Sequence, residues 1–186
     1  MRLFTGIALP ADVSENLEWL IKRLKPTAKI KWSRVVNLHI TTKFIGEWPE
    51  SRLGELRDVL AALTARDSFP VGVRKLGWYP NERAPRVFWA GVEAPDDLLE
   101  LAADTSRLVE QLGVKPERRD YSPHLTLARV KGPAALGALK QAVEELPSRE
   151  FGQFEATSFH LYRSEPRSAG PRYTSLAEYP LDASHE

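Results

Sequence analysis

Residues 38–47, LHITTKFIGE, place a histidine inside a run of apolar and β-branched residues. Such a run predicts a β-strand, in which successive side chains point to opposite faces. His39, Thr41 and Lys43 are therefore predicted to share one face, with Phe44 on the other. The His39 and Thr41 side chains would stand roughly 6–7 Å apart, close enough to hold one small ligand. Taken alone, such a histidine is more often a structural residue of a half-buried strand, bonded to a backbone carbonyl.

The composition sets broad limits on the protein. The chain has 186 residues, of which 42% are hydrophobic and 27% charged, as in a globular protein of one domain or two joined lobes. Its net charge of +1 gives no overall field, so local groups must hold any anionic ligand. The lack of cysteine excludes disulfides, thiolate zinc sites and a cysteine nucleophile, and suits a reducing compartment. Without a signal peptide or an apolar run of about 18 residues, the sequence predicts a cytoplasmic protein with no membrane partner.

A second tripeptide of the same kind, His124-Leu125-Thr126, follows the first at an offset of 85 residues (124 − 39 = 85). The offset predicts a duplication within a single bilobal domain over 1–186, with repeat units of approximately 1–85 and 86–170 and a closing strand at 171–180. A core histidine preserved by duplication is the alternative explanation for the pair. Other residues related by the same offset are Gly6 and Gly91, Ile7 and Val92, Phe69 and Phe154, and Glu93 and Glu178.

Hydrophobic periodicity predicts that each half runs strand, helix, HxT strand, helix, strand, strand. Helices are predicted at 12–25, 49–65, 96–113 and 133–147. Strands are predicted at 2–8, 30–34, 38–45, 69–78, 86–93, 121–130, 154–163 and 172–179. The predicted fold is α+β: a bilobal, pseudo-twofold duplication with two mainly antiparallel sheets facing a central cleft and helices on the outside. Each sheet should be backed by two helices, and 172–179 should join the sheet that contains 2–8.

Two histidines facing each other across a phosphorus atom suit hydrolysis of a phosphodiester. One imidazole can take a proton from the attacking oxygen while the other, as imidazolium, gives a proton to the leaving oxygen. The hydroxyls of Thr41 and Thr126 can donate hydrogen bonds to the non-bridging phosphoryl oxygens. Competing chemistries fit less well, since the chain has no P-loop and no nucleophile elbow. Asp120 and His124 are the nearest approach to a metal-ligand spacing, and neither a metal nor a cofactor is expected.

The segments that carry the two motifs resemble the two-histidine phosphoesterase superfamily, together with RLFTGIALP at the start and LYRSEP…GPRYTSLAEYPL at the end. Within it they resemble the RNA 2′,3′-cyclic phosphodiesterases, also called 2′-5′ RNA ligases. The resemblance implies metal-independent opening of a terminal 2′,3′-cyclic phosphate to a 2′-phosphate, with weak ligation as the reverse chemistry. It assigns Thr41 and Thr126 to the two motifs, His124 as the proton acceptor for water and His39 as the proton donor to O3′.

Five further residues are predicted to bind the substrate. The resemblance places a basic residue after the second motif, where Arg129 stands, although strand alternation puts Arg129 on the wrong face unless a bulge intervenes. Lys43 would meet a neighbouring phosphate or water. The candidates for stacking on a base are Phe4, Tyr121 and Tyr162. The arginine-bearing loop 163–172 could touch RNA phosphates, whereas His160 is interpreted as strand filler and His185 as a tail residue.

The predicted partners are RNA ends or nucleotides that bear a 2′,3′-cyclic phosphate, and the chain is predicted to act as a monomer. A different class of function uses the same scaffold: a nucleotide- or RNA-binding module in which the histidines only hold phosphate. Intact histidine and threonine at both motifs favour the enzyme, and binding of a cyclic-phosphate nucleotide without turnover would favour the module.

Overall fold

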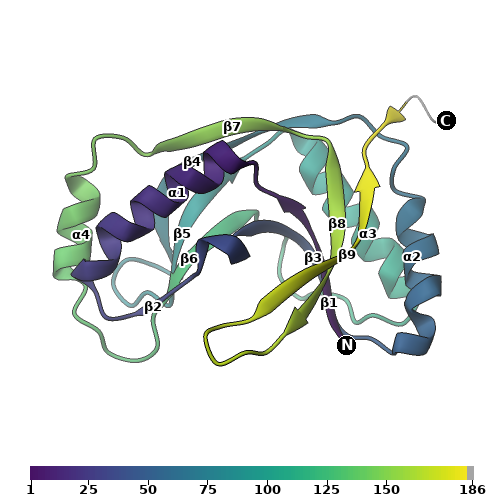
Figure 1. The fold of residues 1–186 in the computed structure, drawn as a ribbon, viewed down its shortest axis with the longest axis horizontal. Coiled ribbons are helices and arrows are strands. Elements are labelled where there is room, and N and C mark those ends of the chain that lie inside the picture. Colours follow the sequence, from purple (N-terminus) through teal and green to yellow (C-terminus); the bar gives the residue numbers. More distant parts are fainter. Residues whose placement is uncertain (184–186) are drawn as a thin grey trace.

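Two antiparallel sheets make up the computed structural model, which describes residues 1–183 (Figure 1). Sheet A has the strand order β3-β1-β8-β9 and sheet B the order β2-β6-β5-β4-β7. This arrangement confirms the predicted α+β class and the joining of the last strand to the sheet of the first. The strands of sheet A are β1 (Arg2–Ala8), β3 (His39–Glu47), β8 (Ser158–Glu165) and β9 (Arg172–Pro180). Those of sheet B are β2 (Lys31–Trp32), β4 (Phe69–Tyr79), β5 (Val87–Glu93), β6 (His124–Arg129) and β7 (Glu150–Ala156).

The four predicted helices all form, two of them shorter than expected. The long helices follow their apolar stripes, and α1 also has Asp12 in its first turn and Lys22 and Arg23 in its last, which suits the helix dipole. Residues 50–52 form a 3₁₀ turn instead of the first turn of a helix, and the fourth helix begins at 137, after Gly132 with its positive φ of 73°. The helices are α1 (Ala11–Leu24), α2 (Leu53–Ala61), α3 (Asp96–Gln111) and α4 (Gly137–Glu144), with 3₁₀ turns η1 (Lys25–Thr27), η2 (Val35–Asn37) and η3 (Glu50–Arg52).

The helices cross over between the lobes. Helix α1 lies between β1 and β3 in the sequence, yet it packs on β7 of sheet B, where Asn16 Nδ2 donates to the Phe151 carbonyl at 2.8 Å. Helix α3 follows β5 of sheet B, yet it packs on β3 of sheet A. Figure 1 shows the result, with α1 and α4 beside sheet B and α2 and α3 beside sheet A. Each sheet is therefore backed by two helices, one of which comes from the other half of the sequence.

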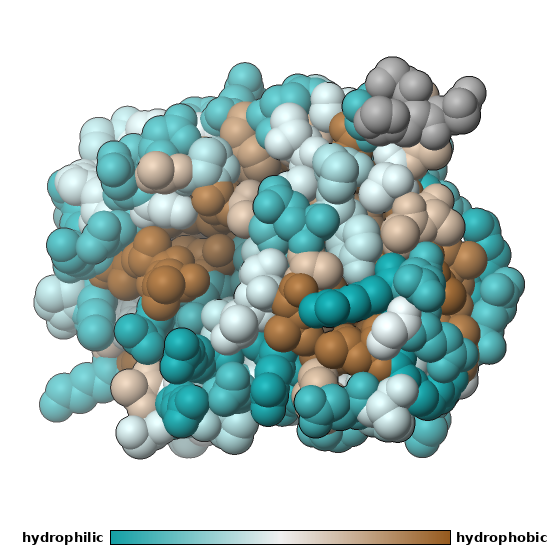
Figure 2. Space-filling view, turned by 45° about the vertical axis from the view of Figure 1, so that its right-hand side comes forward, coloured by the Kyte–Doolittle hydropathy of each residue, from teal (hydrophilic) through white to brown (hydrophobic). Residues whose placement is uncertain are grey.

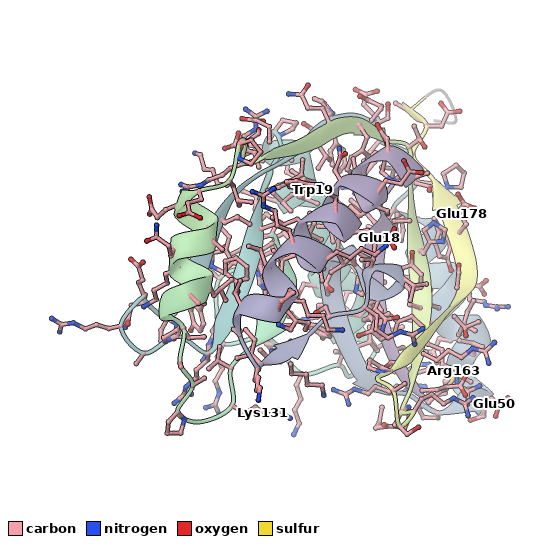
Figure 3. All side chains as sticks on the ribbon, turned by 60° about the vertical axis from the view of Figure 1, so that its left-hand side comes forward. Glu18, Trp19, Glu50, Lys131, Arg163 and Glu178 are labelled. Carbon is pink, nitrogen blue, oxygen red and sulfur yellow. The ribbon has the colours of Figure 1, made fainter. Side chains whose placement is uncertain are left out.

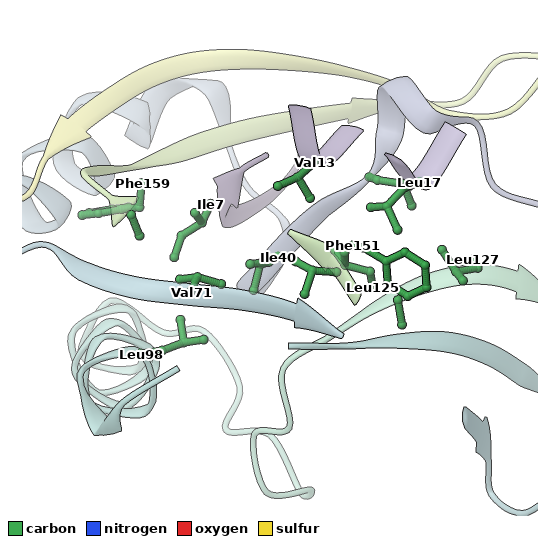
Figure 4. Packing of buried hydrophobic residues seen from close by; sticks show 14 of the residues in the cluster. Ile7, Val13, Leu17, Ile40, Val71, Leu98, Leu125, Leu127, Phe151 and Phe159 are labelled. Carbon is green, nitrogen blue, oxygen red and sulfur yellow. The ribbon is translucent and has the colours of Figure 1, made fainter. Parts of the chain in front are cut away.

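Strands are exchanged in the same way. Strand β4 comes from the first half but pairs with β5 in sheet B, and β8 comes from the second half but pairs with β1 in sheet A. The lobes therefore do not coincide with the two stretches of sequence on either side of residue 85. One continuous cluster of buried side chains runs through both, from Ile7 and Ile40 of sheet A to Leu125 of sheet B (Figure 4).

The surface is mixed in character, as the hydrophilic and hydrophobic patches in Figure 2 show. None of the helices over residues 1–183 is long and apolar enough to span a bilayer.

Candidate active site

Each HxT strand has a β-bulge immediately after its threonine. In sheet A, Gly6 pairs with Thr41 and Thr5 with Lys43, which leaves Thr42 without a partner of its own. In sheet B, Trp89 pairs with Thr126 and Phe88 with Ala128, which leaves Leu127 in the same position. A bulge adds one residue to one strand and so shifts the alternation of faces beyond it. We call the face of each sheet that carries the HxT side chains its motif face.

The first bulge overturns the predicted faces of two residues. Lys43 is 3% exposed and points away from the motif face, with its Nζ 3.9 Å from Glu117 Oε1. Phe44 is 59% exposed and lies on the motif face, where its ring is 6.2 Å from that of Phe4. The prediction that Lys43 shares a face with His39 was therefore wrong, because simple alternation holds only for a strand without a bulge.

The second bulge has the opposite effect, because it brings Arg129 onto the motif face. Leu127 and Ala128 are both buried in succession, so Arg129 is exposed on the same side as Thr126. The positive charge of Arg129 also acts on Tyr173 of sheet A, which places the guanidinium toward the other lobe. Since 44 + 85 = 129, Phe44 and Arg129 occupy equivalent places after the two motifs.

Aromatic rings enclose His39. Its imidazole stacks on Phe4 with ring centroids 4.6 Å apart, and Tyr173 meets it edge-on at 5.1 Å. This burial lowers the pKa of His39 from 6.5 to about 4, against a hydrogen bond to the backbone of Asn37 that acts in the raising direction. The Nε2 atom lies 3.1 Å from Thr41 Oγ1. His39 and Thr41 therefore form a hydrogen-bonded unit with a neutral imidazole at pH 7.

His124 is exposed and held from one side only. Its Nδ1 lies 2.9 Å from the Ser122 carbonyl, which can only accept, so Nδ1 carries the proton and Nε2 is directed elsewhere. The backbone two residues before each histidine is thus its hydrogen-bond partner, Asn37 for His39 and Ser122 for His124. The two imidazoles share one mode of anchoring and differ in burial.

Tyr121 joins the two motifs directly. Its hydroxyl donates to the carbonyl of Thr41 at 2.8 Å, although Tyr121 stands only three residues before His124. Burial raises the pKa of Tyr121, so the phenol stays protonated and keeps this donor role. The Cα atoms of β3 and β6 approach within 8 Å of each other. The two HxT strands therefore lie next to each other where the sheets meet.

The remaining aromatic candidates differ in accessibility. Phe4 is 3% exposed, and the rings of His39, Tyr162 and Tyr173 lie 4.6, 5.1 and 5.0 Å from it, so it is not accessible to a base. Tyr162 is half-buried, and desolvation together with Glu178 raises its pKa to about 12. His160 stacks on Tyr162 at 5.2 Å and its Nδ1 lies 2.9 Å from Ser175 Oγ, which makes it a partner in this aromatic group.

Sequence reasoning missed three aromatic residues of the motif faces, namely Phe44, Tyr173 and Trp89. Trp89 is the counterpart of Phe4 at the 85-residue offset, and that repeat was the available signal. It pairs with Thr126 on one side and with Gly77 on the other, and its indole lies over Gly77, where a Cβ would have no room. The sequence did not indicate Phe44 because the bulge, and not strict alternation, places it on the motif face. It did not indicate Tyr173 because β9 reaches His39 only through the pairing of β8 with β1 and with β9.

Two of the arginines that were predicted to touch RNA phosphates lie beside a carboxylate. Arg163 of β8 and Arg167 of the loop between β8 and β9 both approach Glu165, at 3.9 and 3.2 Å. His185 lies outside the described residues. No three metal-ligating side chains come together within residues 1–183.

A family model for LigT-like phosphoesterases matches the chain twice, over residues 7–89 and 91–173. The chain belongs to the LigT-like phosphoesterase family. It is 35% identical to the RNA 2′,3′-cyclic phosphodiesterase of Methanothermobacter thermautotrophicus over 179 residues, which cover 93% of this chain and 97% of that protein. It is also 35% identical to the protein of that name from Thermus thermophilus over 195 residues, covering 100% of this chain and 92% of the relative.

Solved structures show the same fold. The crystal structure of TT0787 from Thermus thermophilus superposes with a TM-score of 0.83 at 32% identity, over the full length of both chains. The crystal structure of E. coli LigT with 3′-AMP gives a TM-score of 0.76 at 28% identity, covering 97% of each chain. These likenesses extend over both lobes.

Proposed function

We propose that this protein is a metal-independent RNA 2′,3′-cyclic phosphodiesterase that produces a 2′-phosphate. The observation that carries the proposal is the pairing of His39 with Thr41 and His124 with Thr126 on adjacent strands of two facing lobes. Each histidine is anchored by backbone two residues earlier, so that Nε2 of His124 is directed elsewhere and Nε2 of His39 is turned toward the Thr41 hydroxyl of its own motif. Relatives of nearly the same length with this activity in their names support the substrate class.

The proposed step is an in-line displacement at phosphorus. A water oxygen attacks the phosphorus as His124 takes its proton, and the bond from phosphorus to O3′ breaks as His39 gives O3′ a proton. The Thr41 and Thr126 hydroxyls donate to the non-bridging oxygens, where negative charge increases. The products are a 2′-phosphate and a free 3′-hydroxyl. With a 5′-hydroxyl of RNA in place of water, the same step gives a 2′-5′ linkage, which is the ligase reaction.

The proton that His39 donates is taken up with the substrate. A pKa of about 4 leaves the imidazole neutral at pH 7 in the ligand-free protein. A phosphodiester anion beside Nε2 favours the imidazolium and raises this pKa. The exposed His124 meets the opposite side of the phosphate and serves as the base. Substrate binding and protonation of His39 are therefore coupled in this proposal.

Arg129 and Tyr162 are the substrate-binding residues that we retain. Arg129 is exposed on the motif face, where its guanidinium binds a phosphate of the substrate. Tyr162 lies beside the His39 ring at 5.6 Å and stacks on the nucleobase. The Tyr121 hydroxyl is engaged by Thr41, so we assign Tyr121 to positioning the second motif. Lys43 and Phe4 are each 3% exposed and are not included.

We also infer that the chain forms one bilobal domain built from two repeats, with units of approximately 1–85 and 86–170 and a closing strand at 171–180. The two matches of one family model support the duplication. A monomer in the cytoplasm completes the proposal. Size-exclusion chromatography with light scattering should give a mass near 21.0 kDa.

The test is product analysis with a 2′,3′-cyclic nucleotide in the presence of EDTA. We expect turnover to continue in the chelator and phosphorus NMR to show the 2′-phosphate alone. A 3′-phosphate product would place the acid on the wrong side of phosphorus. Activity that disappears in EDTA and returns with a divalent cation would rule out the metal-independent mechanism. Tight binding without turnover would establish the phosphate-binding module instead.

A further inference from the structure

Four strands of sheet B align a row of side chains just beyond the second motif. Tyr79 of β4 pairs with Val87 of β5, Val87 with Arg129 of β6, and Arg129 with Lys31 of β2. In the neighbouring row, Phe88 and Ala128 are fully buried beneath the sheet. By alternation, the row from Tyr79 to Lys31 therefore lies on the motif face of sheet B, on the same side as Thr126.

This row is cationic and accessible. Tyr79 is 46% exposed, and the guanidinium of Arg119 lies 5.5 Å from its ring centroid. Lys31, Arg119 and Arg129 are all exposed. None of these three cations has a carboxylate within 4.0 Å among residues 1–183, in contrast to Arg52, Arg66 and Arg74 elsewhere on the molecule. The row thus has an exposed aromatic ring with one cation beside it at one end and two further cations, on β6 and β2, toward the other end, none of them neutralised locally.

Trp89 connects the row to the motif. It lies in the next motif-face row, between Thr126 and Gly77, with its indole over the glycine backbone. The cationic row is two residues along β5 from the row of Thr126, at Val87 instead of Trp89, so it lies roughly 7 Å beyond that row at about 3.3 Å per residue. An aromatic ring therefore lies beside Thr126 of the proposed phosphate site, one motif-face row before the cations.

We propose that this surface, made of Lys31, Tyr79, Trp89, Arg119 and Arg129, binds the RNA strand on the 5′ side of the cyclic phosphate. The inference rests on the proposed function and specifies its substrate as a single-stranded polynucleotide end. We call the five residues the sheet B lane. With the terminal phosphate at the histidines, the preceding nucleotides run over Trp89 toward Tyr79, and their phosphates meet the three cations.

The chemistry of the sheet B lane suits single-stranded RNA. Aromatic rings that alternate with unpaired cations bind single strands, because every base offers a face for stacking and every nucleotide a negative charge. A mononucleotide reaches only the start of this surface. An oligonucleotide should therefore gain affinity that a cyclic mononucleotide cannot.

The experiment compares kcat/KM for a 2′,3′-cyclic mononucleotide with that for a pentanucleotide ending in the same cyclic nucleotide. We expect the wild-type protein to prefer the pentanucleotide by at least about tenfold. Tyr79→Ala should reduce this preference by at least about fivefold, since stacking on one base is worth about 1 kcal/mol or more. Lys31→Ala should lower the salt dependence of pentanucleotide binding by about 0.7 in the slope of log K against log salt, the value for one contact to a single strand.

Helix α1 supplies matched controls. Trp19 is an exposed aromatic residue, 46% accessible, with the Arg23 guanidinium 5.2 Å from its ring centroid, and it lies on the outer helix (Figure 3). Trp19→Ala and Lys22→Ala should leave the preference as in the wild type. Equal kcat/KM for the two substrates in the wild-type protein would overturn the proposal, as would an equal effect of Trp19→Ala and Tyr79→Ala.

A binding measurement separates failure of the lane from failure of the proposed function. Fluorescence anisotropy with a labelled pentanucleotide that ends in a 2′-phosphate needs no turnover. Weaker binding by Tyr79→Ala, with no change in Trp19→Ala, supports the sheet B lane even if no cyclic phosphate is hydrolysed. Binding that none of the lane substitutions alters contradicts it even if hydrolysis is established.

Discussion

His39 and His124 stand at equivalent places in the two motifs, yet three aromatic rings enclose His39 while His124 is exposed. The sequence could identify both histidines, because an HxT pair repeated at a fixed offset is visible without a structure. It could not show their different burial, which depends on Phe4, Tyr162 and Tyr173 from three other strands. This asymmetry is the physical reason to expect different protonation behaviour from two similar groups.

The first prediction concerns the effect of His39 on stability. Burial lowers the pKa of His39 to about 4, so between pH 6.5 and 4 the unfolded chain binds more protons than the folded one. The contribution of His39 to the free energy of unfolding is therefore complete above pH 6.5 and decreases as the pH falls toward 4. From pH 7 to 4.5, the free energy of unfolding measured in urea should fall by about 2–3 kcal/mol more for the wild type than for His39→Gln, which cannot titrate. Equal losses would contradict the low pKa.

The second prediction concerns the four motif residues. His39→Ala and His124→Ala should each lower kcat by at least about 100-fold, the usual scale for a proton-transfer group. Thr41→Ala and Thr126→Ala should cost roughly tenfold, because each removes one neutral hydrogen bond to the phosphate. Thr64→Ala, in the turn after α2, is the matched threonine control and should change kcat less than about threefold. Similar mild losses at all five positions, measured by steady-state kinetics, would indicate simple binding.

At the scale of the elements, the strand and helix periods predicted the order of the elements and the antiparallel sheets. They missed the bulges at Thr42 and Leu127, since a strict period of two has no place for an additional residue. For that reason Lys43 was assigned to the wrong face and Phe44 was overlooked. The crossing of α1 and α3 between lobes was also beyond reach, because an amphipathic stripe shows that a face is buried but not which sheet covers it.

The third prediction tests whether Gly6 of β1 fixes the position of the His39 ring. A Cβ at Gly6 would lie 2.9 Å from the Ile40 carbonyl oxygen and 3.2 Å from His39 Cδ2. Gly6→Ala should therefore displace the imidazole, lower kcat about tenfold or more, and cost about 1–3 kcal/mol of stability. Gly54→Ala on α2 is the control, since nothing lies within 4 Å of its Cβ position. It should keep kcat and raise stability by up to about 1 kcal/mol. Unaltered kinetics of Gly6→Ala would show that the ring does not depend on this glycine.

At the scale of the whole molecule, the exchanged helices and strands join the lobes into one unit. Helix α1 follows β1 of sheet A in the sequence and packs on β7 of sheet B, while the Tyr121 hydroxyl donates a hydrogen bond from beside the second motif to the Thr41 carbonyl. Neither lobe has its complete set of helices from a single half of the sequence. The lobes should therefore unfold together.

The fourth prediction follows from the exchange of helices and strands between the two lobes. Four of the five tryptophans, at positions 19, 32, 78 and 89, lie on sheet B or on α1, so fluorescence reports mainly on that lobe. Far-UV circular dichroism reports on both sheets. The two urea transitions should coincide, as expected for a single cooperative unit. Separate midpoints would mean that the lobes are independent.

The most direct test of the two-histidine mechanism is rescue by a better leaving group. The account assigns proton donation at O3′ to His39 and proton removal from water to His124. A cyclic substrate whose O3′ position carries a more acidic leaving group needs less help from an acid. Its kcat should therefore recover much more in His39→Ala than in His124→Ala, relative to the ordinary 2′,3′-cyclic nucleotide. Greater recovery in His124→Ala would reverse the two roles, and recovery in neither variant would contradict acid catalysis at this bond.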